Sequence, residues 1–278
     1  MAKKRRHNRK RQLDMAVSTI HHRFGPRALV KGKPPSAVGR AASSIGDVPH
    51  IPTGFPSLDR ALGIGGLPKG QVCELLGPAT SGKTTLALKF LAQAQAGGGQ
   101  VAYVDQALYF DPDYAHRCGL DLSRLLVGTS HDLHEALAMT EALVRNGGLV
   151  ALIFEALDFL WTDPQAASLL ASTFNRLPAA LARSGMVLLV LHESATDGLP
   201  TNSPPTGRSP AGGSPALSAL AHYAAVRLQV VREQWLKHHG DIRGYKARVE
   251  VLKNRLGPAG RTVTLDIEFN GTVRGNGL

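Results

Sequence analysis

The stretch GPATSGKT at residues 77–84 decides how this chain folds. It follows a short apolar run, Val72–Leu76, and overlaps the start of a segment with helical character, Gly82–Gln95. Glycine lets the backbone turn tightly around an anion, and the N–H groups at the start of a helix attract negative charge. A strand, this loop and a helix in succession predict a phosphate-binding loop. The residues that we expect to bind a nucleotide here are Gly77, Pro78, Ala79, Thr80, Ser81, Gly82, Lys83, Thr84 and Thr85.

Two side chains of this loop indicate which nucleotide it binds. Lys83 is spaced to reach β- and γ-phosphates, and the hydroxyl of Thr84 is a magnesium ligand. We therefore expect ATP and Mg²⁺ as cofactors.

Strands and helices alternate along the chain after residue 49, as they do in a parallel sheet covered by helices. The runs that predict buried parallel strands are Val72–Leu76, Val101–Asp105, Leu149–Glu155 and Met186–His192. The runs Val226–Trp235, Lys246–Lys253 and Thr262–Phe269, separated by glycine-containing turns, predict an antiparallel end to the sheet. Further helices are expected at Pro112–Cys118, Leu133–Arg145, Gln165–Arg183 and Ala216–Ala224. The expected fold is α/β, with a mostly parallel sheet flanked by helices and an antiparallel C-terminal extension.

Positive charge is concentrated at the start of the chain. Residues 1–40 contain twelve Lys or Arg and one acid, Asp14, whereas the remaining residues contain twenty of each sign. Such an arm is attracted to the phosphates of nucleic acid, although a solubilising tail has the same composition. We expect a basic disordered arm at 1–11, a helix–strand element with a linker at 12–48, and the ATP-binding core at 49–278. The arm residues that we expect to contact nucleic acid are Lys3, Lys4, Arg5, Arg6, Arg9, Lys10 and Arg11.

No apolar run in the sequence is long enough to span a bilayer, and no apolar segment follows the basic start as it does in a secretory signal. Cys73 and Cys118 lie far apart and form no metal-ligand spacing. We expect both to be reduced core residues of a cytoplasmic protein that does not contact a membrane.

Several sequence motifs outside the loop are as distinctive as the loop itself. Residues 51–59 read IPTGFPSLD and lead into LGIGGLPKG at residues 62–70, just before the loop. Further words are DPDYA at 111–115, GLD at 119–121, YAAVRL at 223–228 and VLKNR at 251–255. In this order the words resemble the bacterial RecA recombinase family, from about Gln12 to Phe269. The resemblance implies the RecA-like P-loop fold.

The resemblance also implies roles for side chains around the nucleotide. Tyr114 would stack on the adenine, and Asp111 would accept a hydrogen bond from its amino group. Lys253 and Arg255 would contact the γ-phosphate of ATP bound to a neighbouring subunit.

For partners, the resemblance implies single-stranded DNA and another protomer. The segment Ser194–Ser214 corresponds to the second DNA-binding loop of the family, and Arg208 is its one cation. The helix Gln12–Phe24 and the strand Arg27–Val30 would dock on an adjacent protomer in a filament, either a second copy or a RecA-type recombinase.

The sequence departs from the family where hydrolysis is catalysed. Ala107 stands at the position of the glutamate that activates the attacking water, and Glu155 replaces the magnesium-binding aspartate. Asp105 is a nearby substitute for the missing base, although it would have to move. His192 and Glu193 replace the amides that sense the γ-phosphate. The first DNA-binding loop is shortened, and we expect no counterpart of the family's small C-terminal domain.

Three functions fit these observations. The first is a recombination and repair protein of the DNA-damage (SOS) response that binds ATP and single-stranded DNA with weak hydrolysis. The second is a fully active DNA-dependent ATPase recombinase whose carboxylate comes from Asp105 or Glu155. The third is a non-hydrolysing RecA-fold partner of another protein, such as a translesion repair polymerase. The Lys83–Thr84 pair argues against a nucleotide-free form of the third, and the low charge around Arg208 weakens the second.

Overall fold

The computed structural model describes residues 15, 18 and 22 and residues 48–193, 214–238 and 241–275. The chain divides into two units, residues 1–44 and 45–278. In the first unit Met15, Ser18 and His22 are helical. The remainder of the expected helix Gln12–Phe24 lies outside the described residues, as do the basic arm, the strand Arg27–Val30 and Arg208.

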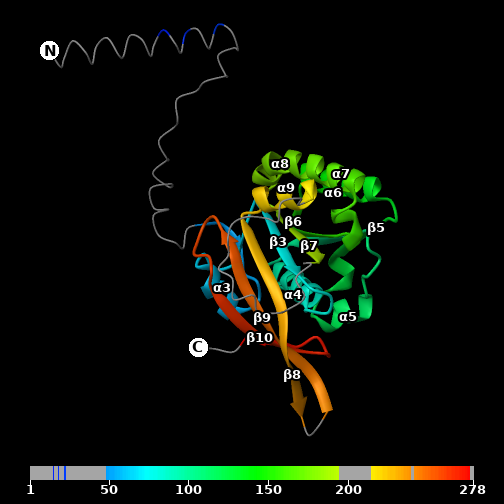
Figure 1. Cartoon of the computed structure of the whole chain (residues 1–278), viewed down its shortest axis with the longest axis vertical. Helices are drawn as coiled ribbons and strands as arrows, with labels where there is room; N and C mark the ends of the chain where they lie inside the picture. The colour runs from blue at the N-terminus through cyan, green and yellow to red at the C-terminus, as the bar shows by residue number, and fades with distance from the viewer. Residues whose placement is uncertain are drawn as a thin grey trace, which may run out of the picture. The chain divides into compact units, whose positions relative to one another are not determined.

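A single large sheet organises the second unit. Its strands are β3 (Val72–Gly77), β4 (Gln100–Asp105), β5 (Leu125–Thr129), β6 (Leu149–Glu155), β7 (Val187–Glu193), β8 (Val226–His238), β9 (Asp241–Asn254), β10 (Thr262–Glu268) and β11 (Val273–Gly275). Among the described residues they lie in the order β11-β10-β9-β8-β3-β7-β6-β4-β5 (Figure 1). Pairing is parallel from β8 to β5 and antiparallel from β8 to β11. The predicted α/β fold with an antiparallel extension is confirmed.

The parallel strands are apolar throughout because helices cover both faces of the sheet. In β7, Val187, Leu189 and Leu191 face one hydrophobic core, while Leu188 and Val190 face the other. The first core receives side chains from α3 (Pro56–Leu62), α4 (Lys83–Ala96) and α5 (Pro112–Arg117). The second core receives them from α6 (Leu133–Asn146), α7 (Pro164–Arg176), α8 (Pro178–Ser184) and α9 (Pro215–Tyr223). Consecutive residues of one strand are therefore buried on opposite faces.

The prediction of a single helix at Gln165–Arg183 is wrong, because the structure contains two helices there. Helix α7 ends at Arg176 and α8 begins at Pro178. Proline has no backbone N–H to donate to the preceding turn, and its ring clashes with the carbonyl four residues earlier. It is, however, well suited to the first position of a new helix, where Pro178 stands.

Some short elements carry too little pattern to be predicted. Strand β5 is the outermost strand beside β4 and is only partly buried, with Leu126 and Val127 exposed by 54% and 41%. Helix α3 has seven residues, too few to show a helical period. A separate two-stranded ribbon joins β1 (His50–Ile51) to β2 (Leu67–Pro68).

The β8–β9 hairpin is longer than its apolar pattern predicts. Its strands continue to His238 and back from Asp241, so the far end extends beyond the helices (Figure 1). There both faces of the hairpin meet solvent and the alternation of apolar and polar residues ends. Trp235 on β8 packs edge-on against Tyr245 of β9 with ring centroids 6.2 Å apart.

Within the described part of the chain, no helix combines the length and hydrophobicity needed to cross a membrane.

Candidate nucleotide-binding site

The phosphate-binding loop connects β3 to α4, as the sequence predicts. A Cβ atom on Gly77 would lie 2.1 Å from the carbonyl oxygen of Val230, so only glycine fits where the strand ends. Gly82 has a φ of 103° immediately before the first residue of α4. This conformation strongly favours glycine and aims the first N–H groups of the helix into the loop.

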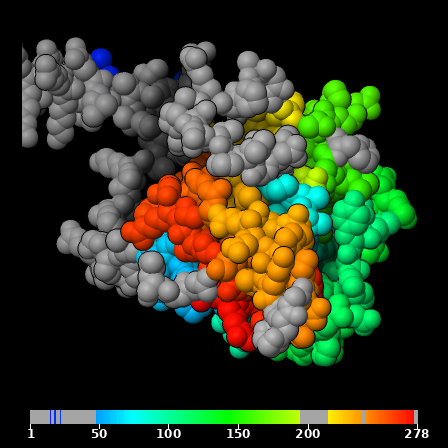
Figure 2. All heavy atoms as spheres, turned by 60° about the horizontal axis from the view of Figure 1, so that its bottom comes forward, coloured from blue at the N-terminus to red at the C-terminus, as the bar shows by residue number. Residues whose placement is uncertain are grey.

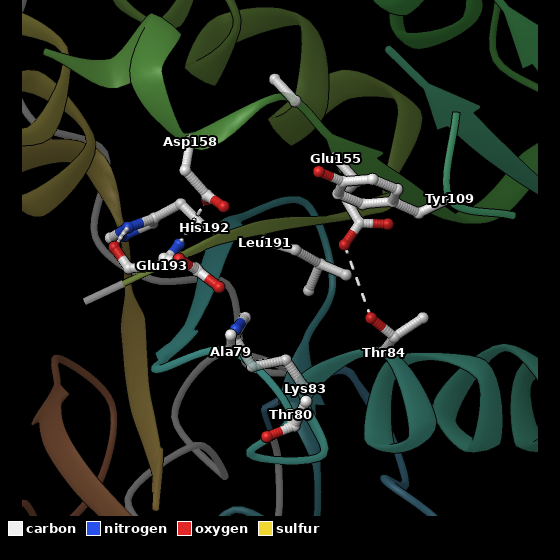
Figure 3. Close-up of a pocket in the computed structure, with 11 residues that line it drawn as sticks. Ala79, Thr80, Lys83, Thr84, Tyr109, Glu155, Asp158, Leu191, His192 and Glu193 are labelled. Atoms are coloured by element: carbon white, nitrogen blue, oxygen red, sulfur yellow. Dashed lines mark hydrogen bonds between the residues drawn. The ribbon is translucent and has the colours of Figure 1, made fainter. Parts of the chain in front are cut away.

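Lys83 and Thr84 open into a cavity of about 260 Å³. The Lys83 ammonium donates hydrogen bonds to the carbonyl oxygens of Gly77 and Pro78, at 2.8 and 2.9 Å. These bonds hold the Lys83 ammonium at the opening of the loop, where it would also bind a phosphate. Figure 3 shows the side chains of the loop on one side of the cavity and those from the ends of β6 and β7 on the other.

Glu155 lies at the end of β6 and is nearly buried. Its Oε1 lies 3.5 Å from the hydroxyl of Thr84, and its Oε2 accepts a short hydrogen bond from Tyr103. Burial raises the pKa of Glu155, although the Tyr103 hydroxyl and the Lys83 ammonium oppose the shift. The longer side chain that replaces aspartate therefore still reaches the threonine at which we expect magnesium.

Ala107, the residue expected at the position of a water-activating glutamate, has no polar group. It is buried and does not line the cavity. Asp105 accepts the backbone N–H groups of Tyr109 and Phe110, at 3.2 and 2.8 Å. Its carboxylate fixes the loop after β4, so serving as a base would disrupt that loop.

His192 is held rigidly at the end of β7. Its Nε2 lies 2.6 Å from the Oε1 of Glu74 on β3, and its Nδ1 lies 2.8 Å from the carbonyl oxygen of Glu193. The ring also packs against Trp161, with centroids 5.1 Å apart. Arg227 of β8 binds the same Glu74 carboxylate. Burial alone would raise the pKa of Glu74, but the hydrogen bonds from His192 and Arg227 outweigh it and lower that pKa.

A second carboxylate, Asp158, faces the cavity from the 3₁₀ turn Asp158–Trp161 that follows β6. Its Oδ1 accepts the backbone N–H of Glu193 at 2.9 Å. Burial and the nearby Asp158 raise the pKa of Glu193, and Lys83 lowers it. Sequence reasoning missed Asp158; the signal was a second acid three residues after Glu155 in an otherwise apolar stretch.

The residues expected at the adenine lie beside the start of α4, apart from this cavity. Asp111 caps α5 by accepting the N–H of Tyr114 at 3.0 Å. The Tyr114 hydroxyl lies 2.7 Å from that of Thr85. Tyr245 of β9 adjoins both groups, and burial raises its pKa to about 12. The arrangement gathers two aromatic side chains at one end of the loop.

Lys253 and Arg255 lie away from the cavity, at the end of β9. Lys253 donates to the carbonyl oxygens of Ala221 and His222, at 2.6 and 3.1 Å, and Arg255 also binds that of His222. Both cations thus bind the last carbonyl groups of α9, where the helix dipole favours positive charge. In this arrangement neither contacts the chain's own phosphate-binding loop.

Known proteins resemble this chain over nearly its full length. The sequence profile of the RecA N-terminal domain matches residues 11–274. Protein RecA of Brucella anthropi is 34% identical over 280 residues, which cover 95% of this chain and 73% of that protein. Protein RecA of Bartonella tribocorum is 35% identical over 272 residues, covering 92% and 74%. The chain belongs to the RecA family.

The family resemblance predicted from the sequence is therefore confirmed, and the fold agrees with it. A crystal structure of the RadB recombinase superposes with a TM-score of 0.62. The superposition covers 82% of this chain and 100% of that one at 21% sequence identity. At that identity the superposition shows a shared fold and nothing more. The match to RecA-family sequences supports the same fold independently.

The Glu74 cluster generates a stability prediction. We expect Glu74→Gln to lower the free energy of unfolding by about 3 kcal/mol at pH 7, because it leaves the Arg227 guanidinium and the His192 ring without their shared buried carboxylate. The folded-state pKa of Glu74 is lowered, so its stabilisation is present above the unfolded pKa near 4.5. It is lost as the pH falls through the folded pKa. Urea unfolding from pH 7 to pH 3 measures the wild-type and variant curves.

Glu141→Gln is the matched control, because Glu141 pairs with Arg176 and Arg145 on the surface of α6. Surface pairs contribute less than about 1 kcal/mol. Equal decreases in the free energy of unfolding of the two variants at pH 7 would show that the buried cluster contributes no more than a surface pair.

Proposed function

We propose that this RecA-family protein binds ATP with magnesium and single-stranded DNA, hydrolyses ATP weakly, and acts in recombination and repair. One observation carries the nucleotide part. Lys83 and Thr84 of the loop and Glu155 at the end of β6 line the same cavity. This juxtaposition supplies an anion cradle and a cation ligand side by side.

The residues present fit magnesium. The Thr84 hydroxyl and a Glu155 oxygen lie 3.5 Å apart and face each other across the cavity, and both are hard oxygen donors. They would hold the ion directly or through water. Bound magnesium neutralises negative charge on the phosphates. The loop N–H groups and Lys83 orient those phosphates and exclude water from their inner side.

Weak hydrolysis follows from the lack of a base at Ala107 and from the contacts that already hold Asp105 and Glu155. Alanine cannot accept a proton, so Ala107 removes a base that is worth a factor of about 10² to 10⁴. The Asp105 oxygens are both used by backbone N–H groups. Glu155 is bound to Tyr103 and faces Thr84. These contacts disfavour the alternative of a fully active recombinase based on either carboxylate.

Single-stranded DNA would contact the basic arm and, among the described residues, the β8–β9 hairpin. Residues 226–254 contain seven Lys or Arg against three Asp or Glu. Arg232 lies over the ring of Trp235, 4.3 Å from its centroid, and Trp235 is 41% exposed. Figure 2 shows the yellow and orange hairpin residues forming part of the molecular surface. Exposed aromatic rings beside cations favour stacked bases and phosphates.

Self-association, or association with a RecA-type recombinase, would use the N-terminal helix Gln12–Phe24 and the strand Arg27–Val30 of one protomer. The outermost strand β5 offers a matching surface, because Leu126 and Val127 are exposed and β4 pairs with only one of its edges. An exposed strand edge favours pairing with another chain. A cytoplasmic location, filaments, a role in the SOS response and a repair polymerase as partner belong to the same proposal.

Lys83→Ala should abolish nucleotide binding, with a loss of at least about a hundredfold in affinity, because the phosphates lose a buried cation. Titration of a fluorescent ATP analogue with magnesium measures this loss. Lys89→Ala is the control, because Lys89 lies on the same helix without lining the cavity. Unchanged affinity in Lys83→Ala would remove the basis of the nucleotide assignment.

Hydrolysis of ATP by the wild-type protein should be very slow on single-stranded DNA. Ala107→Glu should increase phosphate release by up to about a hundredfold, the lower end of the effect of a general base. Ala107→Gln introduces a side chain of nearly the same shape as glutamate that cannot act as a base. That variant should release phosphate at the wild-type rate. A wild-type turnover equal to that of an active RecA protein contradicts this account.

Removal of Met1–Arg11 should weaken binding to an oligonucleotide, because the deletion takes away seven Lys or Arg. Each phosphate contact with a single strand contributes about 0.7 to the slope of log K against log salt. We expect the slope to fall by about two to four units, because only some of the seven charges would contact phosphates at one time. A full-length variant with the seven residues changed to Gln separates charge from length. Equal slopes in all three proteins would show that the arm takes no part.

A further inference from the structure

The cavity carries an unusual excess of negative charge. Three carboxylates line it, Glu155, Asp158 and Glu193, whereas Lys83 is the one Lys or Arg among the described residues in its lining. Glu155 faces Thr84, where magnesium would neutralise it. Asp158 and Glu193 do not contact Thr84. Their negative charge would therefore repel a phosphate that extends past Lys83 into the cavity.

Glu193 faces Lys83 across the cavity. Figure 3 shows its side chain extending from the end of β7 toward Ala79 and Lys83 of the loop. Burial lowers the pKa of Lys83, and the charges of Glu193, Asp158 and Glu155 oppose this shift in that order. The lysine of a phosphate-binding loop lies between the β- and γ-phosphates. A carboxylate that faces this ammonium across the cavity competes with the terminal phosphate for it.

The backbone beneath Glu193 is fixed. Its N–H donates to Asp158 at 2.9 Å, and its carbonyl oxygen lies 2.8 Å from the ring nitrogen of His192. His192 is in turn bound to Glu74. The Cα of Glu193 therefore cannot retreat from the cavity without breaking these contacts.

We infer that Glu193 is a specificity-determining residue that makes this cavity favour a nucleoside diphosphate over a nucleoside triphosphate. The inference rests on the proposed nucleotide-binding function and deepens it. An ionised carboxylate only accepts hydrogen bonds, so it cannot donate one to a phosphate, whereas an amide of the same shape can. The loop N–H groups would bind the β-phosphate, whereas the terminal phosphate would lie beyond Lys83, on the side of the cavity that Glu193 lines. The penalty therefore falls on the terminal phosphate of ATP.

The test compares mant-ADP and mant-ATP binding, both with magnesium, in wild type, Glu193→Gln and Glu135→Gln. Glu135 is an exposed residue of α6 and does not line the cavity. We expect wild type and Glu135→Gln to bind the diphosphate about tenfold more tightly than the triphosphate, given the partial solvent screening of Glu193. Glu193→Gln should tighten triphosphate binding by about tenfold and change diphosphate binding by less than about twofold.

An unchanged ratio of the two affinities in Glu193→Gln overturns the inference. So does weaker triphosphate binding in that variant, because it would mean that the carboxylate assists the γ-phosphate. Failure of the wild-type protein to bind either nucleotide is a separate result, which overturns the proposed function as well. Thermal unfolding of each variant without nucleotide checks that the fold is retained. We expect no change in the midpoint, because neither substitution removes a core side chain.

Discussion

The contact on which the site depends is that between Lys83 and the loop that it closes. A buried ammonium is unfavourable unless it is paired, and this one is stabilised by two backbone carbonyl groups and by three nearby carboxylates. The contact requires β3 to end at a glycine with no room for a side chain and α4 to begin at once. It therefore links the central strand of the sheet, helix α4 and the cavity.

The surroundings of this contact show which parts of the RecA-family site are kept and which have changed. The groups proposed to bind phosphates and magnesium line one cavity, whereas the position expected for the water-activating base is filled by the buried methyl group of Ala107. Asp158 and Glu193 line the opposite side of the cavity. His192 is held by a buried contact with the Glu74 carboxylate, which opposes the movement that a nucleotide sensor needs. Binding without rapid turnover accounts for all of these features.

The sequence predicted the fold well because its strongest signals are local. The loop at 77–84 and the continuous apolar strands need only the chemistry of neighbouring residues. Long-range contacts carried no such signal: nothing near Glu74 in the sequence indicates its pairing with His192 and Arg227. Asp158 was missed because an acid after a strand is ordinary in sequence, and only the fold brings it to the cavity. Proline broke a helix whose apolar period continues through Leu177, so periodicity alone overestimated its length.

The decisive measurement is a crystal structure with a non-hydrolysable ATP analogue and magnesium. We expect the β-phosphate to lie within the loop against Lys83 and the metal to lie between Thr84 and the side chain of Glu155. We also expect the side chain of Glu193 to turn away from its present position, because the terminal phosphate takes its place. A nucleotide bound elsewhere would show that the cavity is not the nucleotide site. So would an empty cavity at saturating analogue, with Lys83 still bound to the carbonyl groups of Gly77 and Pro78.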